Sequence, residues 1–344
     1  MTTEQRTPHA RPGARPKATM QAIVQDEYGE AGVLRLDEIN RPEIGDDEVL
    51  VRVHAAGVDR GVWHLMAGLP YPIRLMGYGL RAPKDRVRGR EVAGRVEAVG
   101  SNVTTLRPGD DVFGIAEGSF AEYARAEARK LAPKPTNLTF AQAAATTISA
   151  LTALQAVRDG ARVQPGQTVL VIGASGGVGT FAVQIAKAFG ANVTGVASTA
   201  KLDLVRSLGA DYVIDYTRED LTAGPQQQFD VVIDIGGNRS LTTLRRALTH
   251  HGTLVIVGGE TGGRWLGGTD RLLRAPLLSR FVSQRLRTLT NSENAPDLLD
   301  LRELVESGKV TPALDRIYPL QDGVAAVRYL TAGHARGKVV INIQ

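Results

Sequence analysis

Apolar residues follow two different periodicities along this chain of 344 residues, and the change comes near residue 140. Before it, short runs of alternating apolar and polar residues, such as 49–55 and 91–99, are separated by turn residues such as 107–110. This pattern is typical of half-buried strands in a compact β-rich domain. The following segment, 139–161, is rich in Ala and predicts a helix.

Beyond residue 160 the chain alternates regularly between apolar runs and amphipathic segments. The runs VLVIG, DVVIDIG and TLVIVGG are apolar at nearly every position, as expected for parallel strands that helices cover on both faces. The pattern therefore predicts an α/β fold with a doubly wound parallel sheet. Its strands are expected at 169–172, 192–197, 212–215, 229–235 and 254–257, and its helices at 178–189, 202–208 and 240–248.

The last 50 residues predict one more helix, at 297–306, and strands at 313–318 and 338–343. A strand at the end of a chain needs a hydrogen-bonding partner. We therefore expect 338–343 to return to the β-rich first domain and pair there.

A glycine-rich turn follows the first strand of the second half and opens its first helix, in the sequence VLVIGASGGVG. Glycines let the backbone approach a pyrophosphate, and the free N–H groups at the helix N-terminus bind it. Ala174 stands where the commonest dinucleotide fingerprint has its first glycine, and a turn without any ligand is the alternative. The residues expected to hold a dinucleotide here are Ser175, Gly176, Gly177, Val178 and Gly179.

The next strand is followed by Ser198, Thr199 and Lys201, and no acidic residue is present there. An NAD site usually has Asp or Glu at this place to bind the ribose hydroxyls, and that carboxylate would repel a 2′-phosphate. Hydroxyl and ammonium groups would bind the phosphate instead, which predicts NADP(H). The two hydroxyl residues also suit the N-cap of the following helix, and the two roles are compatible.

Composition narrows the class of protein. Hydrophobic residues make up 43% and charged residues 22% of the chain, as in globular proteins, and no run approaches the ~20 apolar residues of a membrane helix. The sequence contains no Cys, which excludes a disulfide scaffold, a thiol nucleophile, an iron–sulfur cluster and Cys-liganded zinc. In the absence of a secretory signal, the expected location is cytoplasmic.

The formal charge of +5 comes from two short segments. Residues 1–20 carry +3 and residues 74–90 carry +5, so the other 307 residues sum to −3. This negative remainder argues against nucleic acid as a partner. Residues 1–20 are expected to form a disordered tail, with a targeting presequence as the alternative. The basic segment 74–90 is interpreted as a lid over a cleft or as a solvated loop.

With these features, residues 20–344 resemble the zinc-independent branch of the medium-chain dehydrogenase/reductase superfamily, and most of all its quinone oxidoreductase-like, NADPH-dependent group. The resemblance implies a GroES-like catalytic domain at 21–146 and 291–344, interrupted by a Rossmann NADP-binding domain at 147–290. The cofactor would lie between them, and homodimers are common among such relatives. The supporting motifs are GREVAGRVEAVG at 89–100, RPGDDVFG at 107–114, LTAL at 151–154, the glycine turn at 173–179, LGADYVIDY at 208–216 and GKVVI at 337–341.

The resemblance also implies roles for individual residues. The glycine turn would hold the cofactor pyrophosphate, and Ser198, Lys201 and Tyr216 would surround the adenosine phosphate. The nicotinamide side would be formed by Thr152, Val257, Gly258 and Gly259.

Two departures from the family pattern affect the expected chemistry. Zinc-containing members have Cys and His ligands where this chain has Val58 and Arg90, and the remaining Glu91 cannot make a three-ligand site alone; we expect no metal. Quinone reductase-like relatives usually have Asn where this chain has Asp59. That carboxylate is interpreted as binding a substrate donor, acting as an acid or base, marking altered activity, or only capping the following turn.

Hydride addition to an isolated carbonyl develops negative charge that some group must stabilise. A quinone or an α,β-unsaturated carbonyl spreads this charge by conjugation and takes its proton from solvent, so we expect a conjugated acceptor. The candidate catalytic residues are Asp59, Trp63 and Tyr71, with Tyr78 and Trp265 beside them, although each aromatic residue also suits packing. A tailoring reductase of a biosynthetic pathway and an NADPH-binding sensor without turnover are the alternatives.

The segment 264–287 is rich in Arg and Leu. An amphipathic helix on a membrane surface is one interpretation. We expect Pro276 to break such a helix, which favours packing in a dimer interface or a lid.

Overall fold

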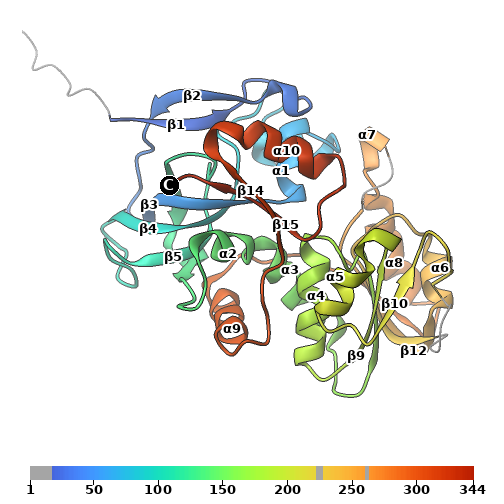
Figure 1. The fold of residues 1–344 in the computed structure, drawn as a ribbon. Coiled ribbons are helices and arrows are strands. Elements are labelled where there is room, and N and C mark those ends of the chain that lie inside the picture. Colours follow the sequence, from blue (N-terminus) through green and yellow to red (C-terminus); the bar gives the residue numbers. More distant parts are fainter. Residues whose placement is uncertain (1–17, 222–227, 260–262) are drawn as a thin grey trace, which may run out of the picture.

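The computed structural model describes residues 18–221, 228–259 and 263–344. Figure 1 shows two lobes, one built around the blue, cyan and red parts of the chain and the other around its green, yellow and orange parts. The first lobe therefore combines the two ends of the described chain. The predicted disordered tail, 1–20, lies outside the described residues except for its last three positions, where the first strand already begins.

The first lobe contains the β-rich region that the alternating pattern predicts. A two-stranded antiparallel sheet, β1-β2, accompanies a seven-stranded sheet in the order β14-β15-β3-β4-β5-β7, with β6 also paired to β3. The strands are β1 (Thr19–Val24), β2 (Arg35–Asn40), β3 (Glu48–Val58), β4 (Glu91–Val99), β5 (Asp111–Ile115), β6 (Tyr123–Glu127), β7 (Leu131–Pro133), β14 (Leu314–Pro319) and β15 (Lys338–Asn342).

The second lobe is a six-stranded sheet in the order β10-β9-β8-β11-β12-β13, and all its neighbouring strands are parallel. This order, with the chain winding outward from β8 in both directions, is the doubly wound arrangement that the sequence predicts. The strands are β8 (Thr168–Ile172), β9 (Asn192–Ala197), β10 (Tyr212–Asp215), β11 (Phe229–Asp234), β12 (Leu248–Ile256) and β13 (Arg285–Thr288), and the helices are α4 (Gly177–Ala188), α5 (Leu202–Ser207), α6 (Leu241–Arg246), α7 (Gly263–Leu266) and α8 (Thr269–Ser279).

The other helices are α1 (Arg60–Ala67), α2 (Phe140–Ala145), α3 (Ile148–Gln155), α9 (Ala295–Glu306) and α10 (Gly323–Thr331). Shorter helical turns cover Ala31–Val33, Arg74–Tyr78, Ala128–Lys130, Ala156–Ala161, Thr199–Lys201 and Leu320–Asp322. The prediction for the C-terminal strand is confirmed, because β15 pairs antiparallel with β3. The helix α10 is an addition that the sequence analysis did not predict.

The single helix predicted at 139–161 is wrong, because the structure divides it between α2 and α3. The Thr146 hydroxyl donates to the Gln142 carbonyl at 2.7 Å, and the Thr147 hydroxyl donates to the Ala144 carbonyl at 3.2 Å. Thr147 itself leaves the helical region of backbone conformation. Hydroxyls that bond to nearby carbonyls offer the backbone an alternative to the helical ladder, and the Ala-rich pattern concealed two such residues in succession.

The expectation that Pro276 breaks a helix is also wrong, because α8 continues through it. Pro276 is exposed, so its ring meets no packed neighbour. Ala275 is fully buried in an apolar cluster of the second lobe that includes Leu170 and Phe229. Leu272 and Leu278, three residues before and after Ala275, pack against the same cluster. This apolar stripe holds the helix in place despite the hydrogen bond that a proline cannot donate.

One hydrophobic core runs through both lobes. Its members include Ala55 and Phe113 of the first sheet, Leu151 of α3, and Phe181 of α4 on the second sheet. Because α3 packs against α4, the two lobes share buried side chains and do not meet only through polar surfaces.

A buried ion pair lies at the junction of the two lobes. The Lys338 ammonium pairs with the Glu91 carboxylate and also donates to the Ser149 hydroxyl at 3.0 Å. Lys338 is 1% exposed and Glu91 is not exposed at all. A Cβ atom at Gly177 would lie 3.1 Å from Lys338 Cδ, so the pair packs directly against the N-terminus of α4.

We expect Lys338→Met to lower the free energy of unfolding by about 3–5 kcal/mol at pH 8, because it leaves the Glu91 carboxyl buried without its cation. The double variant Lys338→Met/Glu91→Gln should recover much of this loss. Denaturant unfolding measures both, with Arg206→Met, which removes an exposed ion pair to Asp203, as the control expected to cost under about 1 kcal/mol. A loss as small as that of the control would contradict the prediction.

Candidate active site

The predicted cofactor residues of the second lobe come together at one edge of its sheet. The parallel strands β8, β9, β10 and β12 all end at this edge, which is where doubly wound sheets bind ligands. The residues that follow these strand ends are the glycine turn after β8, Ser198, Thr199 and Lys201 after β9, Tyr216 after β10, and Val257, Gly258 and Gly259 after β12.

The glycine turn has the geometry of an anion cradle. Gly176 is the N-cap of the twelve-residue helix α4, and it has no side chain to bond to the first N–H groups of the helix. A Cβ at Gly179 would lie 2.1 Å from the Gly173 carbonyl oxygen, so only glycine permits this close turn. The uncapped N–H groups and the positive end of the helix dipole fit the pyrophosphate of a dinucleotide.

The predicted phosphate residues after β9 are partly engaged with other groups. Ser198 makes no side-chain cap to the following turn, which leaves the predicted capping role unsupported. The Thr199 hydroxyl donates to the Asp215 carboxylate. The Lys201 ammonium donates to the carbonyls of Gly333 at 3.3 Å and Ala335 at 2.8 Å.

The Lys201 side chain is half-buried where it meets residues 333–335 of the first lobe. Burial lowers its pKa, and the nearby positive charge of Arg336 lowers it further. The side chain of Tyr216, on the adjacent strand end, is exposed. Lys201 and Tyr216 therefore follow the ends of two neighbouring strands, β9 and β10, which the Thr199–Asp215 hydrogen bond joins at this corner of the sheet.

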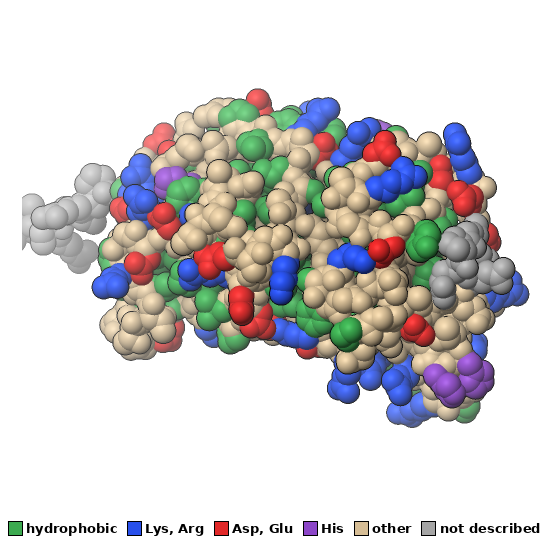
Figure 2. Space-filling view, turned by 60° about the horizontal axis from the view of Figure 1, so that its bottom comes forward, with side chains coloured by type: hydrophobic (Ala, Val, Ile, Leu, Met, Phe, Trp, Pro, Cys, Tyr) green, Lys and Arg blue, Asp and Glu red, His purple; other side chains and the backbone are tan. Residues whose placement is uncertain are grey.

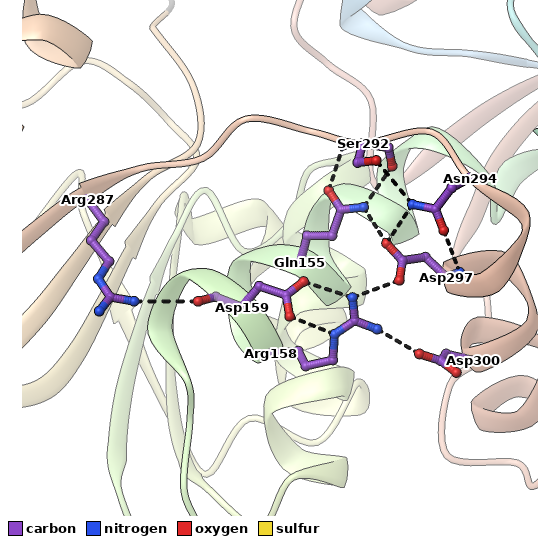
Figure 3. Close-up of polar contacts among 8 residues, drawn as sticks. All are labelled: Gln155, Arg158, Asp159, Arg287, Ser292, Asn294, Asp297 and Asp300. Atoms are coloured by element: carbon purple, nitrogen blue, oxygen red, sulfur yellow. Dashed lines mark hydrogen bonds and ion pairs between the residues drawn. The ribbon is translucent and has the colours of Figure 1, made fainter.

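A polar network fixes the predicted nicotinamide side of the site, and Figure 3 shows it. The Asn291 amide donates to the Thr152 hydroxyl at 3.1 Å. Next to it, the Gln155 amide donates to the Ser292 carbonyl at 2.7 Å and to the Asp297 carboxylate at 2.6 Å. These bonds hold the 291–297 segment, which leads into α9, against the end of α3.

The Arg158 guanidinium is the centre of the same network. It bonds to Asp297 at 2.7 Å, to Asp300 at 2.6 Å and to its neighbour Asp159 at 2.8 Å. On the far side of this group, Arg287 of β13 donates to the Gly160 carbonyl at 2.9 Å. The end of α3, the helical turn Ala156–Ala161, α9 and β13 are thereby tied together (Figure 3).

Asp59 follows the end of β3, and of the roles offered for it the structure shows the helix cap. Its Oδ1 accepts the Val62 N–H at 3.2 Å and so caps α1. The residue is 8% exposed. Its Oδ2 is buried and has no hydrogen-bond partner among the described residues. A buried carboxylate oxygen without a partner is costly, which indicates a place for a donor from a bound molecule.

Two ionisable groups lie close to Asp59. Burial raises the pKa of Glu91 to about 7; the charge of Lys338 opposes this rise and the charge of Asp59 adds to it. The Arg90 guanidinium pairs with Glu293 at 2.7 Å, and Asp59 is among the negative groups that act on it. Two carboxyl groups, Asp59 and Glu91, therefore lie close together here, between the cations Arg90 and Lys338.

The two predicted aromatic residues are separated in the structure. Trp63 is half-buried on α1, packs against a core of the first lobe and lies under the Arg60 guanidinium at 4.9 Å. Tyr71 meets the edge of Trp265 with ring centroids 5.1 Å apart, and its N–H donates to the Arg264 carbonyl at 2.9 Å. Tyr71 thus joins the first lobe to α7, whereas Trp63 takes part mainly in packing.

Comparison with known proteins supports a common origin for this arrangement. A family model described as "Alcohol dehydrogenase GroES-like domain" matches residues 45–136, and one described as "Zinc-binding dehydrogenase" matches residues 208–341. The chain is 36% identical over 341 residues to the chloroplastic NADPH-dependent alkenal/one oxidoreductase of Arabidopsis thaliana, and 35% identical over 339 residues to the 2-methylene-furan-3-one reductase of Solanum lycopersicum. Each match covers 94% of this chain and 79% of the relative.

A solved structure of the quinone oxidoreductase from Coxiella burnetii superimposes with a TM-score of 0.80 at 30% identity, covering 95% of this chain and all of that one. The chain belongs to the medium-chain dehydrogenase/reductase superfamily. The predicted placement among its quinone oxidoreductase-like, zinc-independent members is confirmed, as is the Rossmann and GroES-like fold. Membership makes the chain an oxidoreductase with a nicotinamide cofactor.

One of the matching descriptions names zinc, but the medium-chain dehydrogenase/reductase positions for its ligands are otherwise occupied here. Val58 is buried in an apolar core, Arg90 pairs with Glu293, and Glu91 pairs with Lys338. Within the described ranges, no group of three or more His, Asp or Glu side chains is placed to hold a metal ion. The expectation of a metal-free site stays a prediction.

The basic segment 74–90 belongs to the first lobe, which corresponds to the GroES-like catalytic domain and is called the catalytic lobe below. Arg74 donates to the Gly68 carbonyl at 2.9 Å, Arg86 pairs with Asp26 at 2.6 Å, and Arg88 is 6% exposed. Beneath the segment is a cavity of about 210 Å³, which Arg90 also lines. Arg74, Arg88 and Arg90 thus make internal contacts, whereas residues 75–77 and 84–86 are exposed. The choice between a lid and a solvated loop stays open.

Three residues that support the candidate site were not predicted from the sequence: Ser149, Asn291 and Lys338. Ser149 and Asn291 carry no motif, because their roles depend on contacts with residues more than fifty positions away. The sequence does contain a signal for Lys338. It is a single charge at the start of the apolar strand KVVIN, and a charge buried in a strand needs a buried partner.

The network around Arg158 predicts a specific dependence of stability on pH. Burial alone would raise the pKa of Asp297, but hydrogen bonds from Arg158, Gln155 and Asn294 outweigh it and hold that pKa below its ordinary value. Such a carboxylate stabilises the fold above its unfolded pKa, near 4, and the stabilisation is lost as pH falls through the folded pKa.

We therefore expect Asp297→Asn to be less stable than wild type at pH 7, and the difference to shrink as pH falls from about 5 to 3. Denaturant unfolding at a series of pH values measures it. Asp300→Asn removes the more exposed partner of the same arginine and should have little effect at any pH. A difference for Asp297→Asn that stays constant with pH would contradict the assignment.

Proposed function

We propose that the protein is an NADPH-dependent reductase that transfers hydride to a conjugated acceptor, a quinone or an α,β-unsaturated carbonyl. The observation that carries this proposal is the combination of an uncapped glycine turn with a strand end, Ser198 to Lys201, that lacks an acidic residue. Two relatives are named for NADPH-dependent reduction of alkenals or enones and for reduction of a furanone, and a structural neighbour for quinones.

The bound cofactor would supply the hydride. The residues of the chain bind and orient it: the N-terminus of α4 binds the pyrophosphate, and Ser198, Lys201 and Tyr216 take the 2′-phosphate side. Thr152, held by Asn291, faces the nicotinamide together with the turn that follows β12. Holding two reactants in one geometry supplies a large part of the rate enhancement of such a reaction.

A conjugated acceptor suits the groups present at the mouth of this site. Each of the two cations here already has an acidic partner: Arg90 pairs with Glu293, and Lys338 pairs with Glu91. Neither is therefore free to stabilise the negative charge of a developing alkoxide. A quinone or enone delocalises the charge and needs less stabilisation from the protein. Tyr71 and Trp63 supply aromatic surface on the catalytic lobe, and the unpartnered Oδ2 of Asp59 accepts a hydrogen bond from the bound cofactor or substrate.

The sequence also predicts a homodimer. The strand β13 is one edge of the six-stranded sheet. Leu273 and Leu277 of α8, which packs on β13, and Phe281 between the two elements are each more than half exposed. An edge strand beside exposed apolar side chains supports self-association. Figure 2 shows acidic and basic side chains intermingled over most of one face, which gives nucleic acid no broad basic surface there.

The described part of the chain has no helix long and apolar enough to cross a membrane. The cytoplasmic location stays a prediction of the sequence.

We expect the purified protein to oxidise NADPH when quinones or enals are supplied, and to oxidise it faster than NADH at equal low concentration. Loss of nicotinamide absorbance with a panel of conjugated acceptors measures this, with a saturated ketone as the matched control. Tight NADPH binding with no turnover across the panel would remove the proposal in favour of a binding or sensing role.

We expect Asp59→Asn to lower kcat/KM by roughly tenfold or more, since it replaces a buried acceptor by an amide donor facing the bound molecule. The Asn oxygen can still cap α1, so thermal unfolding should change little. Asp59→Ala removes the cap as well and should also lower stability by about 1 kcal/mol. Unchanged kinetics in Asp59→Asn would reduce the residue to a helix cap.

A further inference from the structure

A segment of the catalytic lobe lies directly across the cofactor edge of the Rossmann sheet. The Gly337 N–H donates to the Ser175 carbonyl at 2.9 Å, and Gly337 also forms an isolated bridge with Gly176 of the glycine turn. Two to four residues earlier, the carbonyls of Gly333 and Ala335 accept hydrogen bonds from Lys201. The segment 333–337 therefore spans from the pyrophosphate turn to the adenosine corner.

Arg336 lies between these two anchor points. Its backbone N–H donates to the Asp315 carboxylate at 2.9 Å, which fixes the backbone at this residue. Its side chain is exposed, and the guanidinium has no ion pair with any residue in the described part of the chain. It is nevertheless close enough to Lys201 for its positive charge to act on that ammonium.

Arg336 and Lys201 carry like charges at a ligand-binding edge, so an anion that binds between them is attracted by both. The backbone contacts of the segment bring this arginine and Lys201 together, and no carboxylate pairs with the guanidinium there. The charge of Asp315 also acts on Lys201, but this carboxylate accepts the Tyr329 hydroxyl and the Arg336 N–H, both at 2.9 Å, and makes no ion pair with the guanidinium.

The hydrogen-bond donors near this corner are few. The Thr199 hydroxyl is committed to Asp215, so it is not free to donate to a phosphate. Lys201 has three N–H donors, and two of them go to the carbonyls of Gly333 and Ala335. One ammonium donor and the hydroxyls of Ser198 and Tyr216 remain, and only one of these three donors is charged, which is little for a dianionic phosphate.

We propose that Arg336 binds the 2′-phosphate of NADPH together with Lys201 and determines the preference for NADPH over NADH. The planar guanidinium supplies the paired donors that a phosphate takes in bidentate fashion. The inference rests on the NADPH preference in the proposed function. It adds that this preference is completed by the catalytic lobe, so that the phosphate connects the two lobes across their junction.

The test uses two ligands that differ only in the 2′-phosphate: adenosine 2′,5′-bisphosphate and adenosine 5′-monophosphate. Calorimetric titration of the full chain measures each without any turnover. Arg336→Ala should weaken binding of the bisphosphate roughly ten- to hundredfold, as expected for a charge-assisted hydrogen bond, and change binding of the monophosphate less than about twofold. Arg336→Lys should lie between wild type and Arg336→Ala.

The matched control is Arg328→Ala, which removes an exposed arginine from α10 in the same lobe and should leave both affinities unchanged. Lys201→Ala also removes the contacts that hold the segment. The combined loss in Lys201→Ala/Arg336→Ala should therefore be smaller than the product of the single losses.

The inference is overturned if Arg336→Ala leaves bisphosphate affinity unchanged, or if it weakens both ligands equally, as a residue that binds the pyrophosphate or only holds the segment would. Failure of the proposed function looks different. If wild type binds the two ligands equally, the NADPH preference itself is wrong and this inference falls with it. If wild type discriminates but reduces no conjugated acceptor, the phosphate site stands and the proposed reaction does not.

Discussion

The buried ion pair between Lys338 and Glu91 is the constraint on which the rest of the site depends. Its two charges come from β4 and β15, 247 residues apart in the sequence, and the Ser149 hydroxyl completes it from α3. Charges buried this deeply tolerate little displacement, since separation leaves each without compensation. Because Lys338 also packs against Gly177, the position of the glycine turn is tied to the position of the catalytic lobe.

The chain on either side of Lys338 contacts both parts of the candidate site, the cofactor edge of the second lobe and the end of β3 in the first. Residues before Lys338 lie across the glycine turn and over Lys201, and residues after it form β15, which pairs with β3. The register places Val339 opposite Val58, one residue before Asp59. The unpartnered carboxylate oxygen of Asp59 and the uncapped N-terminus of α4 are therefore held in one frame. Ligand groups that meet both would bridge the lobes without requiring either to refold.

Much of the fold was predictable because its strands are buried on both faces. The predicted limits of β9 and β10 match the structure, since their apolar runs end where the turn residues begin. The glycine turn was predictable for a related reason, as backbone geometry there demands particular residues. The break at Thr146, the passage of α8 through Pro276 and the contacts of Lys338 were not. Each depends on side-chain bonds or packing that local periodicity does not contain.

Asp59 shows why a substitution at a family position need not mean loss of function. A carboxylate that served only as a cap would be expected to turn its second oxygen to solvent, whereas this oxygen is buried beside Glu91 and Arg90. The cost of that burial includes repulsion from Glu91, whose raised pKa records the same interaction. A donor from a bound molecule would satisfy this oxygen. Under the proposed function, the molecule whose pyrophosphate meets the uncapped N–H groups of α4 is the one in place to supply that donor.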